Sequence, residues 1–281
     1  MTSHPLMSNS KTSFVARSYL FVPASRPERI AKAQRAGAHH VIVDLEDAVA
    51  PVEKEPARAA LAAHLTGGQP VLVRVNGPET EWFEDDLALC NEAGVSGVLL
   101  PKAETVEQLR ATADRVGPDR ILLPLIETAR GFEQARALAE SGLAQRLIFG
   151  FIDFQLDLGI EGEREELLYF RSRLVLVSRL AGLPAPVDGV SVAIEDGERV
   201  HAETAYVKRL GFGGKLCIHP RQVPIVNACF VPTAEEQAWA RRVLDAAAES
   251  RGSAIAVDGK MVDVPVIRKA EEIMAQVRSE A

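Results

Sequence analysis

Short apolar runs alternate with longer amphipathic stretches along most of the chain, and this alternation constrains its fold more than any other feature. Eight apolar runs predict strands, at Ser18–Pro23, His40–Glu46, Val71–Asn76, Gly97–Lys102, Ile121–Glu127, Leu147–Asp153, Val187–Ser191 and Lys215–His219. Short strands that are almost entirely apolar are typical of a parallel sheet buried on both faces. The strand–helix repeat therefore predicts an α/β fold, and eight repeats predict closure into a (β/α)8 TIM barrel. An open doubly wound sheet is the alternative, but no GxGxxG follows the first strand.

The length leaves room for more than the barrel, because the chain has 281 residues and such a barrel typically needs about 250. Residues 1–13 are polar and are predicted to be a disordered lead-in, followed by the barrel over residues 14–231. Residues 232–281 are predicted to form a C-terminal helical extension, with helices at Pro232–Ser250 and Val264–Ser279 and a turn at Val257–Lys260. We expect this extension to pack over the barrel rim or against a neighbouring subunit.

Charge and cysteine usage narrow the class of protein. The net charge of −7 argues against a nucleic-acid partner, and no apolar run approaches the roughly 20 residues that span a bilayer. The three cysteines, Cys90, Cys217 and Cys229, are too widely spaced to form a metal set and predict free thiols in a cytoplasmic protein. In so acidic a chain, an anionic substrate needs local positive charge from a metal ion or an arginine.

Polar residues gather at the carboxyl ends of the predicted strands. They are Asp44, Glu46, Asp47, Arg74, Asn76, Lys102, Glu127, Asp153 and His219. In a (β/α)8 barrel these ends meet at one rim, where active sites lie. We therefore expect residues that are far apart in sequence to surround one site.

Glu127 and Asp153 end two successive apolar strands, where a carboxylate is costly unless something compensates its charge. A hard divalent cation such as Mg²⁺ would do so, since it is commonly held by one or two carboxylates. Equally, each carboxylate could cap the helix that follows its strand, and spacing alone leaves the two interpretations open. Asp157 competes with Asp153 as the second ligand, but a helical turn would carry it away from the rim.

Arg74 lies inside an apolar strand, where an arginine is rare unless it is paired. It could clamp a carboxylate or stabilise a developing oxyanion, or it could form an ion pair with Glu46 or Asp47. Strand alternation predicts that Asp44 and Glu46 share one face and that Asp47 lies on the other. One of these acids could be a general acid or base, or the cluster could be a structural network that fixes Arg74 and Lys102.

Taken together, the motifs resemble the HpcH/HpaI aldolase and citrate lyase beta-chain family of CoA-ester lyases, over nearly the whole chain. Individually weak, they occur in this order: RSYLFVP from Arg17, VDLEDAV from Val43, VRVN from Val73, LPKAE from Leu100, PLIETARG from Pro124, FGFIDFQLDLG from Phe149, GKLCIHPRQ from Gly214 and GKMVDVPVIRKA from Gly259. The resemblance implies a Mg²⁺-dependent carbon–carbon lyase that forms trimers or larger homo-oligomers.

The resemblance also implies roles for individual residues. Glu127 and Asp153 correspond to the metal ligands, and Arg74 corresponds to the arginine beside the bound 2-oxo acid. Backbone N–H groups at Gly150 and Phe151 correspond to those that hold the substrate carboxylate. The tail acid Asp263 resembles an acid that related malyl-CoA and citramalyl-CoA enzymes supply from a neighbouring subunit. One departure is Phe151, because the family pattern often has a small residue after Phe-Gly.

The expected reaction is cleavage of a 3-hydroxyacyl-CoA-type thioester, of the citryl, malyl or citramalyl kind, into a 2-oxo acid and an acyl-CoA. Arg74, Asp263, Glu46 and Asp47 are the candidate catalytic residues. Two alternatives are a class II aldolase that acts on a free 2-oxo acid and a beta subunit of a multienzyme citrate lyase that acts on a carrier-protein thioester. A catalytically idle binding protein on this barrel is a further alternative, which the intact set of Arg74, Glu127 and Asp153 argues against.

Overall fold

The computed structural model describes residues 15–65, 69–249 and 255–278. These residues belong to two compact units, one spanning Ala16–Phe230 and one that contains residues 15, 231–249 and 255–278. The predicted lead-in at residues 1–13 lies outside the described residues. Within the described part of the chain, no helix has both the length and the apolar composition needed to cross a membrane.

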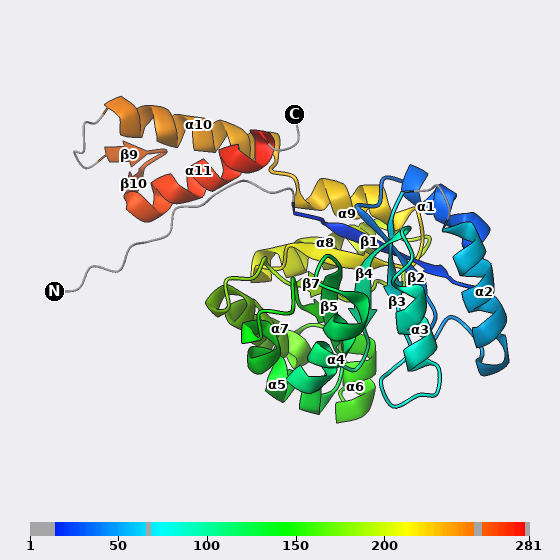
Figure 1. The fold of residues 1–281 in the computed structure, drawn as a ribbon. Helices are drawn as coiled ribbons and strands as arrows, with labels where there is room; N and C mark the ends of the chain where they lie inside the picture. The colour runs from blue at the N-terminus through cyan, green and yellow to red at the C-terminus, as the bar shows by residue number, and fades with distance from the viewer. Residues whose placement is uncertain (1–14, 66–68, 250–254, 279–281) are drawn as a thin grey trace. The chain divides into compact units, whose positions relative to one another are not determined.

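In the first unit, eight parallel strands in sequence order close into a barrel (Figure 1). They are β1 (Ser18–Pro23), β2 (His40–Asp44), β3 (Val71–Arg74), β4 (Val95–Leu100), β5 (Ile121–Ile126), β6 (Ile148–Phe149), β7 (Val187–Asp188) and β8 (Gly214–Cys217). The barrel closes where β8 pairs with β1, with Tyr19 opposite Leu216. The predicted TIM barrel is therefore confirmed, and the open sheet is excluded.

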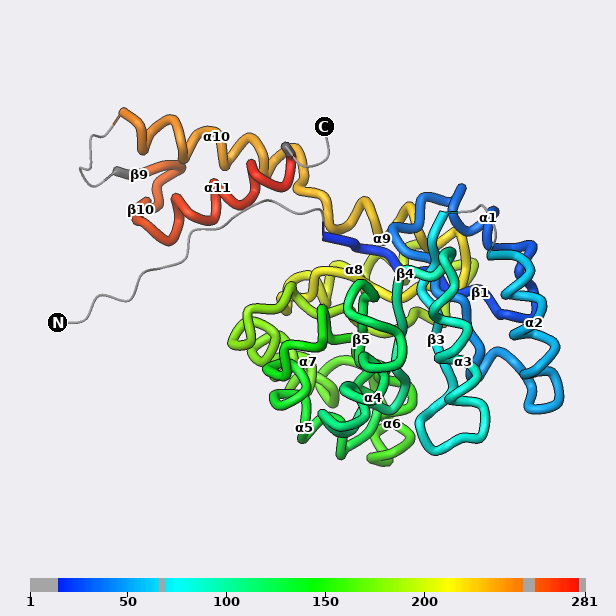
Figure 2. Tube along the Cα trace, in the orientation of Figure 1, coloured from blue at the N-terminus to red at the C-terminus, as the bar shows by residue number. Residues whose placement is uncertain are grey.

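The helices follow the strands around the outside of the barrel, as the chain trace shows (Figure 2). They are α1 (Ile30–Arg35), α2 (Lys54–His64), α3 (Phe83–Leu89), α4 (Val106–Val116), α5 (Ala129–Glu140), α6 (Phe151–Leu158), α7 (Glu165–Leu180), α8 (Gly197–Leu210) and α9 (Gln222–Phe230). Both α6 and α7 lie between β6 and β7. The short helix α6 therefore begins directly at the rim, one residue after β6.

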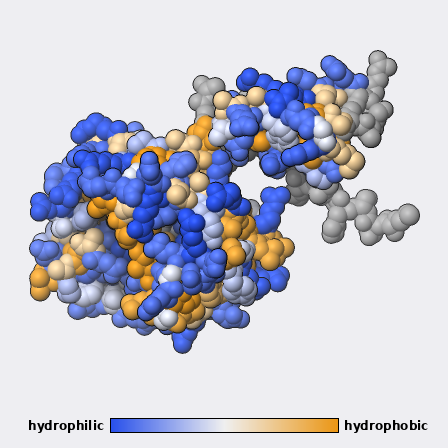
Figure 3. All heavy atoms as spheres, turned by 180° about the vertical axis from the view of Figure 1, so that it is seen from behind, coloured by the Kyte–Doolittle hydropathy of each residue, from blue (hydrophilic) through white to orange (hydrophobic). Residues whose placement is uncertain are grey.

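The core has two layers because side chains alternate along each strand. In β1, Tyr19 points into the barrel and Leu20 points out toward the helices. The inner layer is filled by residues such as Ile42, Leu72 and Leu99, and the outer layer joins the strands to the helices. The bottom and middle of the barrel are thus a packed core rather than a pore, which leaves the rim for a site. On the surface, apolar patches are interspersed among hydrophilic side chains (Figure 3).

Several strands end earlier than the sequence predicts. β2 stops at Asp44 rather than Glu46, and β6 comprises only Ile148–Phe149. β7 stops at Asp188 rather than Ser191. The polar residues beyond these ends leave the hydrogen-bonded ladder and form rim loops or a helix start. These segments read as strand in the sequence because the apolar pattern does not reveal where the ladder ends.

The second unit contains α10 (Ala234–Glu249), the antiparallel pair β9 (Ile255–Val257) and β10 (Lys260–Val262), and α11 (Val264–Arg278). The predicted turn is confirmed, because Asp258 and Gly259 adopt left-handed backbone angles between the two strands. Its own small core contains Ala240, Val243, Val262 and Ala270. The predicted packing of this extension over the rim or against a neighbouring subunit stays a prediction.

Candidate active site

A cavity of about 410 Å³ lies at the carboxyl ends of the barrel strands. Its polar side is lined by Asp44, Asp47, Arg74, Glu127 and Asp153. Its apolar side is lined by Phe21, Leu125, Phe151, Val190, Leu216 and Ile218. The structure thus brings together acids and an arginine that are widely separated in sequence, at the rim where (β/α)8 enzymes work.

Arg74, the last residue of β3, is held by three carboxylates. Its Nε and Nη2 donate to the two carboxylate oxygens of Asp44 at 2.7 and 2.6 Å. Its Nη1 lies 3.0 Å from Glu46 Oε2 and 3.3 Å from Asp47 Oδ2. Burial tends to lower the pKa of Arg74, but these carboxylates outweigh it and raise the pKa above its ordinary value. Arg74 is therefore a fixed cation that is both paired and in contact with the cavity.

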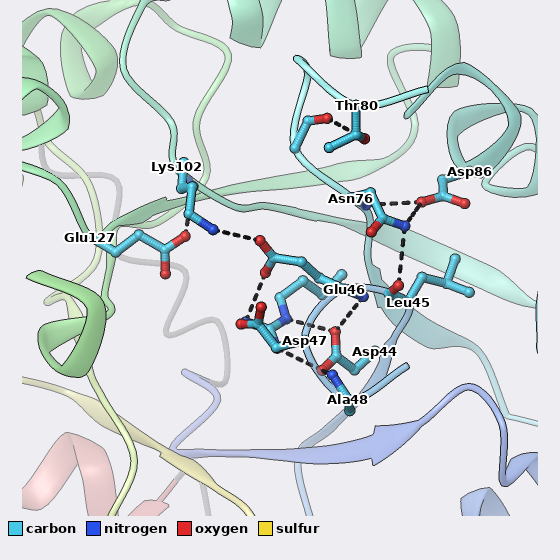
Figure 4. Close-up of polar contacts among 12 residues, drawn as sticks. Asp44, Leu45, Glu46, Asp47, Ala48, Asn76, Thr80, Asp86, Lys102 and Glu127 are labelled. Atoms are coloured by element: carbon cyan, nitrogen blue, oxygen red, sulfur yellow. Dashed lines mark hydrogen bonds and ion pairs between the residues drawn. The ribbon is translucent and has the colours of Figure 1, made fainter. Parts of the chain in front are cut away.

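Asp44 also shapes the loop that follows β2. Its carboxylate accepts the backbone N–H groups of Glu46, at 2.9 Å, and Ala48, at 3.2 Å (Figure 4). This local turn ends the strand, so side-chain alternation does not continue beyond Asp44. The prediction that Asp47 faces away from Asp44 and Glu46 is wrong, because all three acids reach Arg74.

Lys102 connects two acids of the site. Its backbone N–H donates to Glu127 Oε1 at 2.8 Å, and its ammonium donates to Glu46 Oε1 at 2.9 Å (Figure 4). The backbone at Lys102 is left-handed, with φ of 45°. Non-glycine residues seldom adopt this conformation. Lys102 therefore fixes the relative positions of the loop after β2 and the end of β5.

Glu127 follows β5 and is 2% exposed. Burial, together with the charges of Glu46 and Asp153, raises the pKa of Glu127 to about 8. A Cβ atom at position 150 would lie 2.7 Å from Glu127 Oε2. Glycine at that position therefore allows the carboxylate to lie directly against the backbone at the start of α6.

Asp153 does not end a strand, as the sequence suggested, but lies in the first turn of α6. Its contribution to the pKa of Glu127 reflects the proximity of the two carboxylates. Neither acid caps a helix. Thr128 caps α5 by accepting the N–H of Gly131 at 3.0 Å, and the N-cap of α6 is Gly150. The interpretation of Glu127 and Asp153 as helix caps is therefore excluded.

The N-terminus of α6 faces the cavity, since Gly150, Phe151, Ile152 and Asp153 all line it. The Gly150 N–H, just beyond β6, donates to the Ile126 carbonyl at 2.9 Å, so it does not hold a substrate carboxylate as predicted. The N–H groups of the next three residues have no acceptor within the helix. Together with the helix dipole, they favour an anion at this end of α6.

The donor set fits a divalent cation. Five carboxylates gather at this rim, where Arg74 and Lys102 form ion pairs with three of them, and Lys54 is a third cation under the loop after β2. The acids therefore outnumber these cations. Among the described residues, no group of three His, Cys, Asp or Glu side chains could hold a metal. Mg²⁺ needs no such group, because it binds one or two carboxylates and takes its other ligands from water or substrate. Glu127 and Asp153 are the residues that would hold it.

The other predicted residues lie elsewhere. Asp157 accepts the Ala129 N–H at 2.7 Å and does not line the cavity. His219 accepts the Arg221 N–H at 3.2 Å within a local turn. Asp263 belongs to the second unit, where its carboxylate accepts the Val266 N–H at 3.2 Å at the start of α11.

Sequence reasoning missed Lys54 and Asp86, and it placed Asn76 at the rim without predicting that Asn76 supports the loop after β2. Lys54 donates to the carbonyls of Leu45 and Glu46, both at 2.7 Å. Asn76 donates to the Leu45 carbonyl at 3.1 Å and to Asp86 at 2.6 Å (Figure 4). Asp86 gives no signal in the sequence, because an acidic run at a helix start normally indicates a solvated face.

Comparisons with known proteins agree with this geometry. Residues 17–220 match the HpcH/HpaI aldolase/citrate lyase family. A citrate lyase subunit beta-like protein of Deinococcus radiodurans is 38% identical, over 92% of this chain and 96% of the relative. A (3S)-malyl-CoA thioesterase of Cereibacter sphaeroides is also 38% identical, over 94% of this chain and 95% of the relative.

Among solved structures, protein CitE of Mycobacterium tuberculosis in complex with magnesium, acetoacetate and coenzyme A superposes with a TM-score of 0.81. That protein is 36% identical, and the match covers 94% of this chain and 98% of the other. The motif-based expectation of a lyase family is thereby confirmed. Fold, rim site and sequence similarity over nearly the whole length agree, and the chain belongs to the HpcH/HpaI aldolase/citrate lyase family.

Proposed function

We propose that this protein is a Mg²⁺-dependent carbon–carbon lyase that cleaves a 3-hydroxyacyl-CoA-type thioester into a 2-oxo acid and an acyl-CoA. The observation that carries the proposal is the meeting of Glu127, Asp153, Arg74 and the start of α6 in one cavity. This set offers two anionic ligands, a fixed cation and a helix N-terminus. The magnesium and coenzyme A bound to the similar CitE structure support the same chemistry.

The protein's part in the reaction is to bind, orient and stabilise charge. Mg²⁺, held by Glu127 and Asp153, would supply Lewis-acid chemistry at the substrate hydroxyl and carbonyl oxygens. The N–H groups of the first turn of α6 would bind the substrate carboxylate, beginning with that of Phe151. Arg74 would stabilise negative charge that develops during cleavage, and removing such a donor typically costs about 10²–10³ in rate.

Proton transfer is assigned to acids that can reach the cavity. A base takes the proton of the substrate hydroxyl, the carbon–carbon bond breaks, and its electron pair passes to the thioester side, which then takes up a proton. Asp47 lines the cavity with a side chain that is 60% exposed, so it is a candidate for one transfer. Glu46 is buried against Arg74 and Lys102, which makes it a positioning residue.

Asp263 would exchange the second proton. In a homotrimer or larger homo-oligomer, this residue would come from a neighbouring subunit. This assignment rests on the resemblance of the GKMVDVPVIRKA segment to related malyl-CoA and citramalyl-CoA enzymes. The assignment also gives a function to the second unit, in which Asp263 lies between the hairpin of β9 and β10 and the start of α11.

The metal assignment is tested with Glu127→Gln and Asp153→Asn combined. Each change keeps the side-chain size and removes one anionic ligand, so we expect Mg²⁺-dependent turnover to be abolished. Calorimetry should show that Mg²⁺ binding is lost, while near pH 5, where Glu127 is protonated in the folded protein, the thermal midpoint in EDTA stays close to that of the wild type. Retained Mg²⁺-dependent activity in the double variant would refute the assignment.

Thioester hydrolysis is a second candidate, favoured by the similarity to a (3S)-malyl-CoA thioesterase. The two reactions differ in products, because cleavage keeps the thioester on the acyl fragment and hydrolysis releases free thiol. A thiol reagent together with a 2-oxo acid assay therefore separates them. Free CoA without 2-oxo acid would replace the lyase proposal with hydrolysis.

Two further alternatives keep the same metal site. A class II aldolase would act on a free 2-oxo acid and would not bind CoA in calorimetry. A beta subunit of a multienzyme citrate lyase would act on a carrier-protein thioester and would show little activity with the CoA thioester alone. Micromolar binding of CoA and turnover by the isolated chain would favour the proposed lyase over both.

A further inference from the structure

The aromatic ring of Phe151 separates two cavities. In front of it is the 410 Å³ cavity of the proposed active site, and behind it is a second cavity of about 190 Å³ between the barrel and helices α7 and α8. Phe151 lines both and is 4% exposed. Its ring is therefore part of the wall that divides them.

The ring is held in place from several sides. A Cβ atom at Gly189 of the rim would lie 2.5 Å from its Cδ1, so this glycine makes room for the ring. The Arg171 guanidinium carbon lies 4.9 Å from the ring centroid, and the Phe149 ring lies 6.4 Å away. Because close-packed aromatic rings do not move without displacing their neighbours, Phe151 is a fixed wall rather than a mobile gate.

Charged groups lie directly behind this wall. Arg171 donates to Asp188 at 2.8 Å, and Lys215 donates to the same carboxylate at 3.0 Å. All three side chains are at most 3% exposed. One carboxylate is shared by two cations, so this buried cluster has one positive charge in excess. The ring keeps that charge out of the active-site cavity.

In front of the wall, the reacting 2-oxo acid would lie close to the Phe151 side chain. Phe151 is the first residue of α6, and Asp153 in the same turn is a proposed metal ligand. A substrate bound to the metal and to the start of α6 would therefore place one of its substituents toward the ring. An apolar ring accepts a hydrogen or a methyl group, but a second carboxylate against it would lose its hydration without gaining a partner.

We propose that Phe151 determines substrate specificity, limiting the 2-oxo acid product to a small, uncharged substituent such as that of glyoxylate or pyruvate and excluding dicarboxylic 2-oxo acids. This inference rests on the proposed lyase function. The apolar residues Leu125 and Val190, which line the same side of the cavity, reinforce the preference.

The test measures selectivity in two ways, for the wild type and Phe151→Ala. Calorimetry with Mg²⁺ present gives the affinities for glyoxylate, pyruvate, oxaloacetate and 2-oxoglutarate, and condensation of each with acetyl-CoA gives kcat/KM. We expect the wild type to favour pyruvate over oxaloacetate by at least about tenfold, the scale set by one misfitting group in a pocket. Removing the ring should join the cavities and reduce that ratio by about tenfold or more.

Two further variants separate size from charge. Phe151→Leu keeps an apolar wall of smaller size and should retain the discrimination against dicarboxylates. Phe151→Ala combined with Arg171→Met leaves Asp188 neutralised by Lys215 alone, so the gain for dicarboxylates should disappear while a larger uncharged 2-oxo acid is still accepted. Tyr169→Ala, on α7 and 62% exposed in the wild type, is the matched control for loss of an aromatic ring and should leave selectivity unchanged.

The experiment distinguishes failure of the lyase proposal from failure of the specificity role of Phe151. If the wild type binds no 2-oxo acid with Mg²⁺ and cleaves no thioester, the lyase proposal fails. If the wild type is active but binds 2-oxoglutarate as well as pyruvate, or if folded Phe151→Ala keeps the wild-type selectivity, the specificity role of Phe151 is wrong. Should Phe151→Ala lose its cooperative thermal transition, Phe151→Gln takes its place, because it keeps the length of the side chain but replaces the apolar wall with a polar group, and it should reduce the same ratio; an unchanged ratio would refute the role of Phe151.

Discussion

Glu127 is the residue whose environment departs most from that of an ordinary glutamate. Its carboxylate lies between the Lys102 N–H and the backbone at Gly150, and it is close to the charges of Glu46 and Asp153. In the metal-free protein these surroundings favour the protonated acid. A divalent cation reverses that preference, because it compensates the negative charge that burial penalises.

This environment predicts opposite effects of pH on stability and on metal binding. Burial raises the pKa of Glu127 from 4.5 to about 8, so between those values the folded protein holds a proton that the unfolded chain lacks. The metal-free protein should therefore lose stability as pH rises through this window, whereas Mg²⁺ affinity should rise by up to about tenfold per pH unit. Urea denaturation and calorimetry from pH 5 to 9 measure the two trends.

Glu127→Gln is the control for this prediction. It cannot titrate, so the difference in stability between wild type and variant should shrink toward low pH and widen toward pH 8. A pH-independent difference would mean that Glu127 is already ionised in the metal-free fold.

Lys102 illustrates how one residue can act through both its backbone and its side chain. Lys102→Gly and Lys102→Ala both remove the ammonium that contacts Glu46, but only glycine adopts the left-handed backbone without strain. We expect the glycine variant to be more stable than the alanine variant by about 1 kcal/mol in urea denaturation. We also expect it to keep the higher Mg²⁺ affinity, because its N–H stays aligned with Glu127.

A comparison of activities completes this test. Equal loss of activity in the two variants would assign the effect to the ammonium and its ion pair with Glu46. A greater loss in Lys102→Ala would assign it to the backbone contact. Higher stability of the alanine variant would contradict the role given to the φ of 45° at this position.

The elements of the fold were predictable wherever a single periodicity determined them. β1 is apolar from Leu20 to Pro23, and its predicted bounds, Ser18–Pro23, are those observed. The helix start at Thr105 also follows from local chemistry, because a threonine side chain satisfies the first free N–H groups. Such features depend on near neighbours in the chain.

The start of α6 could not be predicted in the same way. Phe149-Gly150-Phe151-Ile152 is as apolar as the strands, but only Ile148–Phe149 pairs within the barrel. Gly150 then departs from strand geometry, and Asp153 becomes part of a helix. The Asp153 carboxylate therefore lies at the rim on the first turn of a helix rather than at the end of a strand. Contacts with the rest of the barrel determine where β6 ends, and these contacts cannot be predicted from the local sequence pattern.

In the site, too, features that depend on the local sequence were predictable, and features that depend on tertiary contacts were not. The sequence predicted Arg74, Glu127 and Asp153 because charged side chains next to apolar strands are conspicuous. A network of acids that fixes Arg74 and Lys102 was one of the alternatives, and the ion pair of Lys102 with Glu46 agrees with it. The sequence did not predict that the Lys102 N–H also contacts Glu127, 25 residues further along the chain. Nor did it predict Lys54 and Asn76 as supports of the loop after β2. Contacts of this kind exist only after the barrel has closed.

At the scale of the whole molecule, two units with separate cores share one chain. The barrel unit contains Arg74, Glu127 and Asp153, whereas Asp263 lies at the start of α11 in the other unit. A homo-oligomer in which each tail completes a neighbouring barrel would make the active site a property of the assembly. It would also mean that an isolated barrel binds Mg²⁺ but turns over slowly.

Mixing two inactive variants tests that arrangement. Arg74→Met lacks the cation of the barrel site, and Asp263→Asn lacks the tail acid but should keep nearly unchanged Mg²⁺ affinity. If the acid is supplied by a neighbour, random mixed oligomers should regain up to about a quarter of the wild-type sites, because one site in four then combines an intact barrel with an intact tail. The measurement is turnover after the two variants are refolded together.

The control is the double variant carrying both changes, which should rescue neither parent because it supplies no intact component. Sedimentation of each parent should give the same oligomer as the wild type, so that any rescue reflects exchange of subunits. If both parents assemble normally and the mixture stays inactive, Asp263 does not act across subunits. In that case the exposed Asp47 of the barrel, which already lies in the cavity, is left as the acid that transfers the proton.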